Sequence, residues 1–249
     1  MAAISLCETS LANLKKRLMD EFDEVKSSHL TEALASSLGF RTNAALKAAM
    51  TGPEADRPFY LLDSEQFLFR LTEFGYPVDP TDLEFDFDIW HKEYGVIKTV
   101  PTSAYDIEYR TPRERAWRNL MVCAVNAALE QKLFTLRPGD DRFDDNMREG
   151  HLFDFVLPSG LPARGSVATA GFDEIAVHAA VNPKGGRLRE HGAGFAAGDV
   201  FGTTWLERRV GAWLQSTPEG FRCRKPFLAE LANLEVKPQG FGDRGKLIM

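Results

Sequence analysis

Apolar residues recur at helical spacing through the first fifty positions. Three segments each follow a hydroxyl residue suited to an N-cap, at Ser10, Ser28 and Thr42. Their apolar faces are Leu11, Leu14 and Leu18, then Leu30, Ala33, Leu34 and Leu38, then Ala45, Leu46, Ala49 and Met50. Gly39 is placed to end the second helix in a left-handed conformation. The pattern predicts a three-helix module within residues 1–52.

The next region combines helices with a strand pair. Asp63 and Gln66 form a variant capping box, which predicts a helix that Gly75 ends. The segment 83–90 alternates strictly between apolar and acidic residues, which predicts a half-buried strand, and a second strand is expected at 96–100. Thr111, Pro112 and Glu114 form a capping box with proline at N1, which predicts a long helix to about residue 133.

Short apolar runs separated by turns dominate the second half. Strands are expected at 151–157, 166–170 and 172–181, followed by a helix at 204–214 and a last helix after Pro226. Strands and helices do not alternate regularly, so the sequence predicts an α+β fold with a mainly antiparallel sheet. The expected domains are 1–52, 59–136 and 150–238, and the last two are compatible with one domain.

One segment carries a resemblance. The sequence ALASSLGFRTNAALKAA, within residues 8–52, resembles a small N-terminal helical module of uncharacterised proteins encoded on bacterial plasmids and integrative elements. Similar helices occur in some glyoxalase-related bacterial proteins. The resemblance implies a binding module on a mobile genetic element, and it transfers no catalytic residue to this chain.

Composition narrows the classes of protein. The chain has 249 residues, 44% of them apolar, and a net charge of −6. This apolar content is enough for a hydrophobic core. No apolar run is long enough to span a membrane, and the N-terminus does not resemble a secretory signal. Cys7, Cys123 and Cys223 are far apart in sequence and odd in number, which favours a reducing cytoplasm.

Charge is unevenly distributed along the chain. Residues 1–109 contain ten Lys/Arg and nineteen Asp/Glu, whereas residues 110–249 contain twenty and seventeen. The first part therefore has a net charge of −9 and the second a net charge of +3. This polarity suits an acidic surface offered to a basic partner, or head-to-tail association of two copies.

Two charged clusters are the candidate partner-binding residues. Glu84, Asp86 and Asp88 lie on one face of the expected strand, about 7 Å apart. We call them the acidic strip, and we expect the strip to meet a basic partner or simply water. Arg113, Arg115 and Arg118 crowd the start of the long helix, where they oppose the helix dipole. Either an anionic partner or an internal salt bridge would compensate them.

The sequence contains only weak signals for catalysis, metal binding or phosphate binding. His151, His178 and His191 lie near a glycine-rich stretch at 192–202, but neither metal-ligand nor phosphate-loop spacing is present. We therefore expect no catalytic residue, metal or cofactor.

The sequence favours a non-catalytic interaction or regulatory protein with a protein partner or a second copy, weak nucleic-acid binding and no membrane contact. Two alternatives remain open: an enzyme using these histidines, and a DNA-binding regulator using residues 28–50 as a helix-turn-helix.

Overall fold

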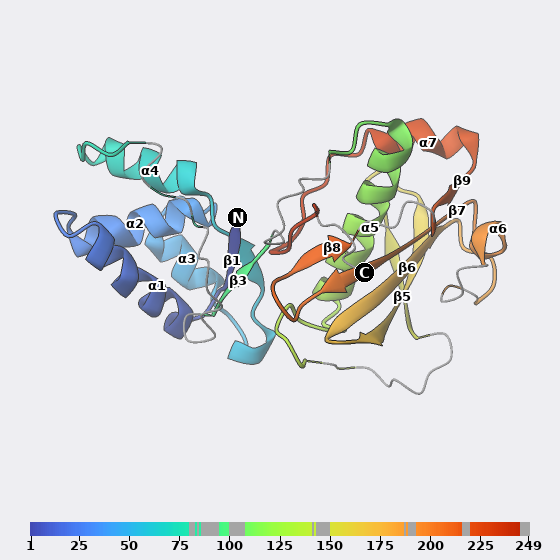
Figure 1. Cartoon of the computed structure of the whole chain (residues 1–249), viewed down its shortest axis with the longest axis horizontal. Helices are drawn as coiled ribbons and strands as arrows, with labels where there is room; N and C mark the ends of the chain where they lie inside the picture. Colours follow the sequence, from blue (N-terminus) through green and yellow to red (C-terminus); the bar gives the residue numbers. More distant parts are fainter. Residues whose placement is uncertain are drawn as a thin grey trace. The chain divides into compact units, whose positions relative to one another are not determined.

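The chain forms two compact units. The computed structural model describes residues 1–79, 83, 85, 95–99, 108–140, 142, 150–186, 188, 193–215 and 220–244. Unit 1 comprises residues 1–99 with 239–241, and unit 2 comprises residues 100–238 with 242–249. Both units combine helices with antiparallel strands (Figure 1), so the predicted α+β class is confirmed.

Unit 1 begins with a strand that the sequence analysis missed. Its elements are β1 (Ala2–Ser5), α1 (Glu8–Glu21), α2 (Ser27–Ser37), α3 (Asn43–Ala49), a 3-10 turn (Glu54–Asp56), β2 (Phe59–Leu61), α4 (Ser64–Glu73) and β3 (Val96–Lys98). In the described part, the strands form an antiparallel sheet in the order β2-β1-β3. The central strand β1 is fully buried, and its four small or apolar residues show no alternation from which to predict it.

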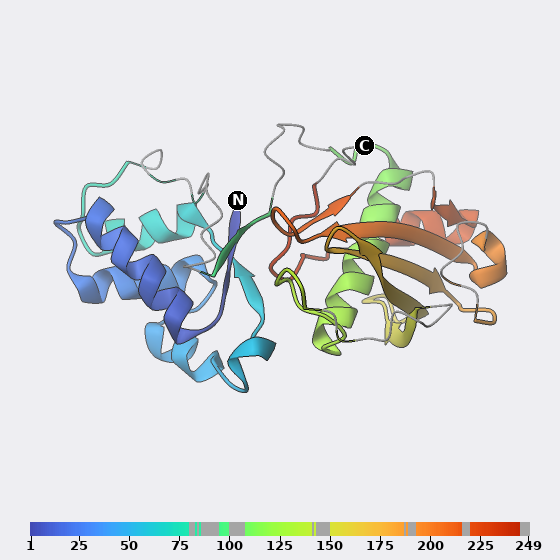
Figure 2. The same cartoon turned by 60° about the horizontal axis from the view of Figure 1, so that its bottom comes forward.

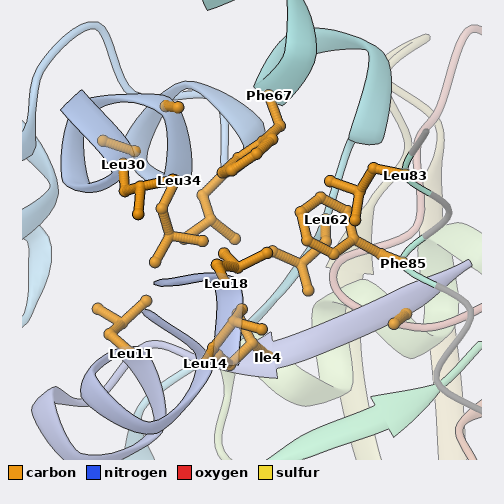
Figure 3. Close-up of a cluster of buried hydrophobic side chains, with 14 of the residues drawn as sticks. Ile4, Leu11, Leu14, Leu18, Leu30, Leu34, Leu62, Phe67, Leu83 and Phe85 are labelled. Atoms are coloured by element: carbon orange, nitrogen blue, oxygen red, sulfur yellow. The ribbon is translucent and has the colours of Figure 1, made fainter. Parts of the chain in front are cut away.

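One apolar core unites the helices of unit 1. Leu14 and Leu18 of α1, Leu34 of α2 and Phe67 of α4 converge on Ile4 of β1 (Figure 3). Helices α1, α2 and α3 form where periodicity predicts them. They do not make a separate module, because α4 and β1 complete their core. The predicted boundary at residue 52 therefore lies inside unit 1.

Two of the helix caps in unit 1 agree with the sequence prediction. Thr42 caps α3 and Asp63 caps α4, as predicted, each through a side-chain oxygen that accepts a first-turn N–H. For α1 the cap is Cys7, whose sulfur accepts the N–H of Ser10, so the predicted cap at Ser10 was wrong by three residues. The predicted cap at Ser28 was also wrong, because α2 already begins at Ser27, after Lys26, which makes no side-chain cap.

Unit 2 places helices on an antiparallel sheet. Its elements are α5 (Pro112–Glu130), β4 (His151–Val156), β5 (Pro162–Gly171), β6 (Glu174–Val181), α6 (Gly194–Ala197), β7 (Val200–Glu207), β8 (Trp213–Gln215), β9 (Arg222–Cys223) and α7 (Lys225–Ala232). Among the described residues, the strand order is β4-β5-β6-β7-β8, and β9 also pairs with β7.

Helix α5 covers one face of this sheet (Figure 2). Thr111 and Glu114 form the predicted reciprocal capping box at its start. Trp117 is buried, and its indole N–H donates to the Thr203 carbonyl at 2.9 Å. Gly202 faces α5, because a Cβ there would lie 3.0 Å from the Met121 side chain. Any larger residue at position 202 would have to displace the flexible end of Met121, so glycine suits the close approach of helix and strand.

The predicted helix at 204–214 is wrong. Thr204 and Glu207 have the spacing of a capping box, but they lie in β7, between β6 and β8. Thr204 donates its hydroxyl proton to the Gln215 carbonyl at 2.7 Å, which ties β7 to β8. Strand pairing in the tertiary structure overrides the local capping-box spacing, because β-branched and aromatic residues such as Phe201, Thr203 and Trp205 fit a sheet well.

Two general properties complete the description. The three cysteines are free thiols. Within the described ranges, no helix is both long and apolar enough to cross a membrane.

Candidate functional site

The acidic strip lies outside the described residues. Glu84, Asp86 and Asp88 therefore have no structural account here. Their apolar neighbours Leu83 and Phe85 are described, and both are buried in the core of unit 1 (Figure 3). The predicted inward direction of these two residues is confirmed, although neither is in a strand.

Arg118 is committed to the interior of unit 2. Its guanidinium pairs with Asp243 at 2.5 Å and donates to the Val236 carbonyl at 2.7 Å. The pair is mostly buried, and the Tyr109 hydroxyl donates to the Asp243 carbonyl. Burial, with a smaller contribution from the Asp243 carboxylate, raises the pKa of Tyr109. Arg118 therefore ties the C-terminal segment to α5, as in the internal alternative that the sequence left open.

The other two arginines of the cluster diverge. Arg115 donates to the Arg110 carbonyl at 2.7 Å and closes the turn before α5. Arg113 is exposed; it donates to the Phe221 carbonyl, and its guanidinium carbon lies 5.2 Å from the Phe221 ring centroid. Among the described residues, Arg113 forms no ion pair with a carboxylate. Only Arg113 of the three remains directed to the surface.

The Arg113–Phe221 contact joins two basic segments that are far apart in sequence. Phe221 directly precedes β9, so Arg113 lies beside a second run of cations. We call Arg113, Arg222, Arg224 and Lys225 the basic surface, and all four are exposed. The two runs are more than a hundred residues apart in the sequence, and only the fold brings them together.

Few negative charges oppose this surface. Asp199 pairs with Arg224 at 3.2 Å and with Lys184 at 2.5 Å. The hydrogen bond from Lys184 is the main cause that lowers the pKa of Asp199. Glu114 is turned toward the cap of α5, where the backbone N–H of Thr111 lowers the pKa of its carboxyl. The described residues thus leave Arg113 and Lys225 without a carboxylate partner.

An aromatic side chain adjoins the basic surface. Phe195 of α6 is exposed, and the guanidinium carbon of Arg224 lies 5.3 Å from its ring centroid. The nearby thiol of Cys223 is half-buried, and burial raises its pKa to about 11. That thiol therefore stays protonated near neutral pH and adds no charge.

His151 and His178, the two described histidines of the enzyme alternative, do not come together. His151 is on β4 and His178 on β6, with β5 between them. The register pairs His151 with Val167, and Ser166 with His178, so the two imidazoles point to opposite faces of the sheet. Residues two strands apart are about 10 Å apart even before this reversal, too far for one metal ion. His191 lies outside the described residues.

A buried polar row crosses the sheet face away from α5. It runs from Ser166 through His178 to Thr203, which are direct partners on β5, β6 and β7. His178 is only 3% exposed, and its ring stacks on Phe201. A serine beside an imidazole suits nucleophilic catalysis, but substrate has no access to groups sealed in this way. We interpret the row as structural.

The glycine-rich stretch also serves packing. A Cβ at Gly198 would lie 2.4 Å from the Val181 carbonyl oxygen, so Gly198 permits close contact with β6. The stretch contains the short helix α6 and the start of β7. It does not form a phosphate-binding loop in the residues that the structure describes.

Buried charged residues lie at the C-terminal end of β7. The Arg208 guanidinium donates to the carbonyls of Thr135 and Asp140 and pairs with Asp173 at 2.7 Å. Glu207 is 3% exposed and faces Glu174 across the strand pair. The sequence analysis missed both groups, because only strand pairing and burial distinguish them from surface charges.

Comparison with known protein families, with curated proteins and with solved structures finds no match for this chain. Within the described part, no group of three or more His, Cys, Asp or Glu side chains gathers in a way that could hold a metal ion. Among the described residues, the basic surface is the candidate site in which the fold brings exposed charges from two distant segments together.

Proposed function

We propose that this chain is a non-catalytic interaction or regulatory protein that binds an acidic protein partner through the basic surface. The observation that supports this is the contact of Arg113 with Phe221, which places the first turn of α5 beside β9 and the start of α7. The resemblance of residues 8–52 supports an origin on a bacterial mobile element. The free thiols are compatible with the cytoplasm that we propose as its location.

Electrostatic repulsion within the basic surface favours the binding of an anionic partner. Arg113 and Lys225 lie in the first turns of α5 and α7, where backbone N–H groups already make the helix ends positive. Cations there are unfavourable until an anion approaches. Carboxylates of a partner relieve this repulsion and accelerate association by attraction at long range. Exposed Phe195 offers an apolar contact beside the charges.

The test compares two variants with the same change in net charge. Arg222→Gln with Lys225→Gln neutralises half of the basic surface, whereas Lys16→Gln with Lys47→Gln neutralises two exposed cations of unit 1. Each protein is used to capture partners from the native host, after nuclease treatment, with mass spectrometry as the readout. We expect an acidic protein that the control retains and the basic-surface variant loses.

Other outcomes separate the alternatives. Recovery of the chain itself, lost in the same variant, identifies a second copy as the partner, with its acidic strip as the natural contact. A partner retained by both variants contradicts the basic surface. About one zinc or iron per chain, lost on His151→Ala or His178→Ala, would instead favour the enzyme alternative.

The DNA-binding alternative has its own test. The residues available to a groove are Asn43 and Lys47 of α3 and Arg41 just before it, and the backbone N–H of Asn43 already donates to the Glu32 carboxylate at 3.1 Å. We expect duplex DNA to bind more weakly than about 1 μM at physiological salt, the tight end of the non-specific range. Nanomolar binding of one sequence, lost on Arg41→Ala with Lys47→Ala, would favour a DNA-binding regulator.

A further inference from the structure

Two glutamates face each other at one end of the β6–β7 ladder. Glu174 begins β6, Glu207 ends β7, and the two are direct cross-strand partners. Side chains of such partners share a sheet face, with Cβ atoms about 4.5–5.5 Å apart. Glu207 is 3% exposed, so this is a like-charge pair with little water to screen it.

Hydrogen bonds hold one oxygen of each carboxyl group. The Gln215 side-chain amide donates to Glu174 Oε1 at 2.6 Å. The Val210 backbone N–H donates to Glu207 Oε1 at 3.1 Å. A proton held between the two carboxyl groups turns their repulsion into a hydrogen bond.

We propose that Glu174 and Glu207 share one proton and form a pH-sensitive latch on the β7–β8 turn. The protonated latch closes the turn at acidic pH, and loss of the proton loosens it as the solution approaches neutrality. Burial is the main cause that raises the pKa of Glu207, and Glu174 adds to it, while the N–H groups of Val210 and Arg209 act in the opposite direction.

The charges around the latch do not replace the proton. Arg209 Nε lies 4.0 Å from Glu207 Oε1, but its side chain is exposed and its guanidinium carbon lies 5.8 Å from the Phe172 ring centroid. Arg208 is directed to backbone carbonyls and to Asp173. On β8, Gln215 is neutral and Trp213 is apolar. The described elements packed here thus offer Glu207 only one exposed cation.

The turn that the latch controls holds other parts of unit 2. Arg208 follows Glu207 directly, and its guanidinium fastens the segment 135–140 and the β5–β6 hairpin through Asp173. Phe172, at the tip of that hairpin, is 80% exposed. Ionisation of Glu207 therefore weakens the place where β7, the hairpin and this segment meet.

The direction of the pH effect follows from the difference in proton binding between the folded and the unfolded state. A carboxyl group with a raised pKa in the folded state binds more protons folded than unfolded. Its stabilising contribution is complete below the ordinary glutamate pKa and is lost as pH rises through the folded-state pKa. The folding equilibrium of the turn changes about tenfold for each pH unit between these two values.

The experiment follows the latch in the intact chain. Carbon-13 NMR of labelled glutamate carboxyl groups is recorded between pH 4 and 8, together with the hydrogen-exchange protection factor of the Val210 amide. We expect Glu207 to titrate above the ordinary glutamate range, and the protection factor to fall as Glu207 ionises. In Glu207→Gln, which imitates the protonated state, the protection factor should stay constant over this range.

Two further variants keep the proposal falsifiable. Glu174→Gln removes the facing carboxylate, so Glu207 should titrate at lower pH than in the wild type. Glu230→Gln on α7 is the matched control and should leave the pH dependence of Val210 unchanged. The latch is overturned if Glu207 titrates in the ordinary glutamate range, or if Glu207→Gln retains the pH dependence of the wild type.

Discussion

The two units bury different chemistry. The core of unit 1 is built from leucine, phenylalanine and alanine side chains of its helices and of β1. The buried polar residues described in unit 1 are Ser5, Ser10, Ser37 and Thr99, and none of them is charged. Unit 2 buries the charges of Glu207 and Arg208 in the end of its sheet, and His178 in the middle. Stability in unit 1 therefore depends on packed volume, and in unit 2 it also depends on charge.

The largest expected effect is removal of the buried cation. Arg208→Met leaves Asp173 and the backbone carbonyls of Thr135, Arg137 and Asp140 without their donor. Breaking such a network costs about 3–5 kcal/mol, because a buried charge loses its partner. Chemical denaturation should show this loss, while exposed Arg209→Met changes the free energy of unfolding by no more than about 0.5 kcal/mol. A loss below 1 kcal/mol for Arg208→Met would mean that water replaces the guanidinium.

Unit 1 should respond to volume and not to pH. Leu18 is fully buried among α1, α2 and β1, so Leu18→Ala should cost about 2–5 kcal/mol. The neighbouring exposed residue supplies the control, since Met19→Ala leaves the core intact. Thermal unfolding between pH 5 and 8 measures both variants. A destabilisation by Leu18→Ala that varies strongly with pH would contradict the comparison of the two units.

Helix capping should give an intermediate effect. Thr111 accepts the N–H of Glu114, and its own N–H donates to the Glu114 carboxylate at 2.8 Å. Thr111→Ala should therefore destabilise unit 2 by about 1 kcal/mol, as loss of an N-cap does. Thr111→Ser retains the oxygen and should behave like the wild type in the same melting experiment. Equal melting of all three proteins would show that α5 is held by packing alone.

The smallest effect on stability is expected for the acidic strip. Glu84→Gln, Asp86→Asn and Asp88→Asn together remove three like charges, which water screens. The free energy of unfolding should stay within about 0.5 kcal/mol or rise slightly. Association with a basic partner should slow, most clearly at low salt. A large fall in melting temperature would show that these carboxylates are internal ion-pair or capping groups.

Local elements were predictable where the chain carries its own signal. Helices α4 and α5 begin at their predicted caps, because Asp63 and Thr111 bond to N–H groups three residues away. The three strands β4, β5 and β6 also form where apolar runs end in turns. Strand β1 was missed because its partners β2 and β3 are far away in sequence, and the β7–β8 pair was missed because Thr204 and Glu207 have the spacing of a helix capping box.

The candidate site depended on tertiary structure even more. The sequence identified Arg113, Arg115 and Arg118 as one cluster. In the folded chain, Arg118 pairs with Asp243 and Arg113 donates to the Phe221 carbonyl. The spacing of the helix placed all three near one helical turn. Which guanidinium reaches a carboxylate depends on the return of a segment more than a hundred residues away.

Sequence alone determined the α+β class, the starts of α3, α4 and α5, and the uneven charge of the two halves, since each follows from neighbouring residues or from composition. Tertiary structure decided that β1 completes the core of unit 1 and that two basic segments form one surface. It also set Glu174 against Glu207, which only the register of β6 and β7 can do. A charge has the same chemistry everywhere in a sequence, but its free energy depends on its burial and its partners, and those are properties of the fold.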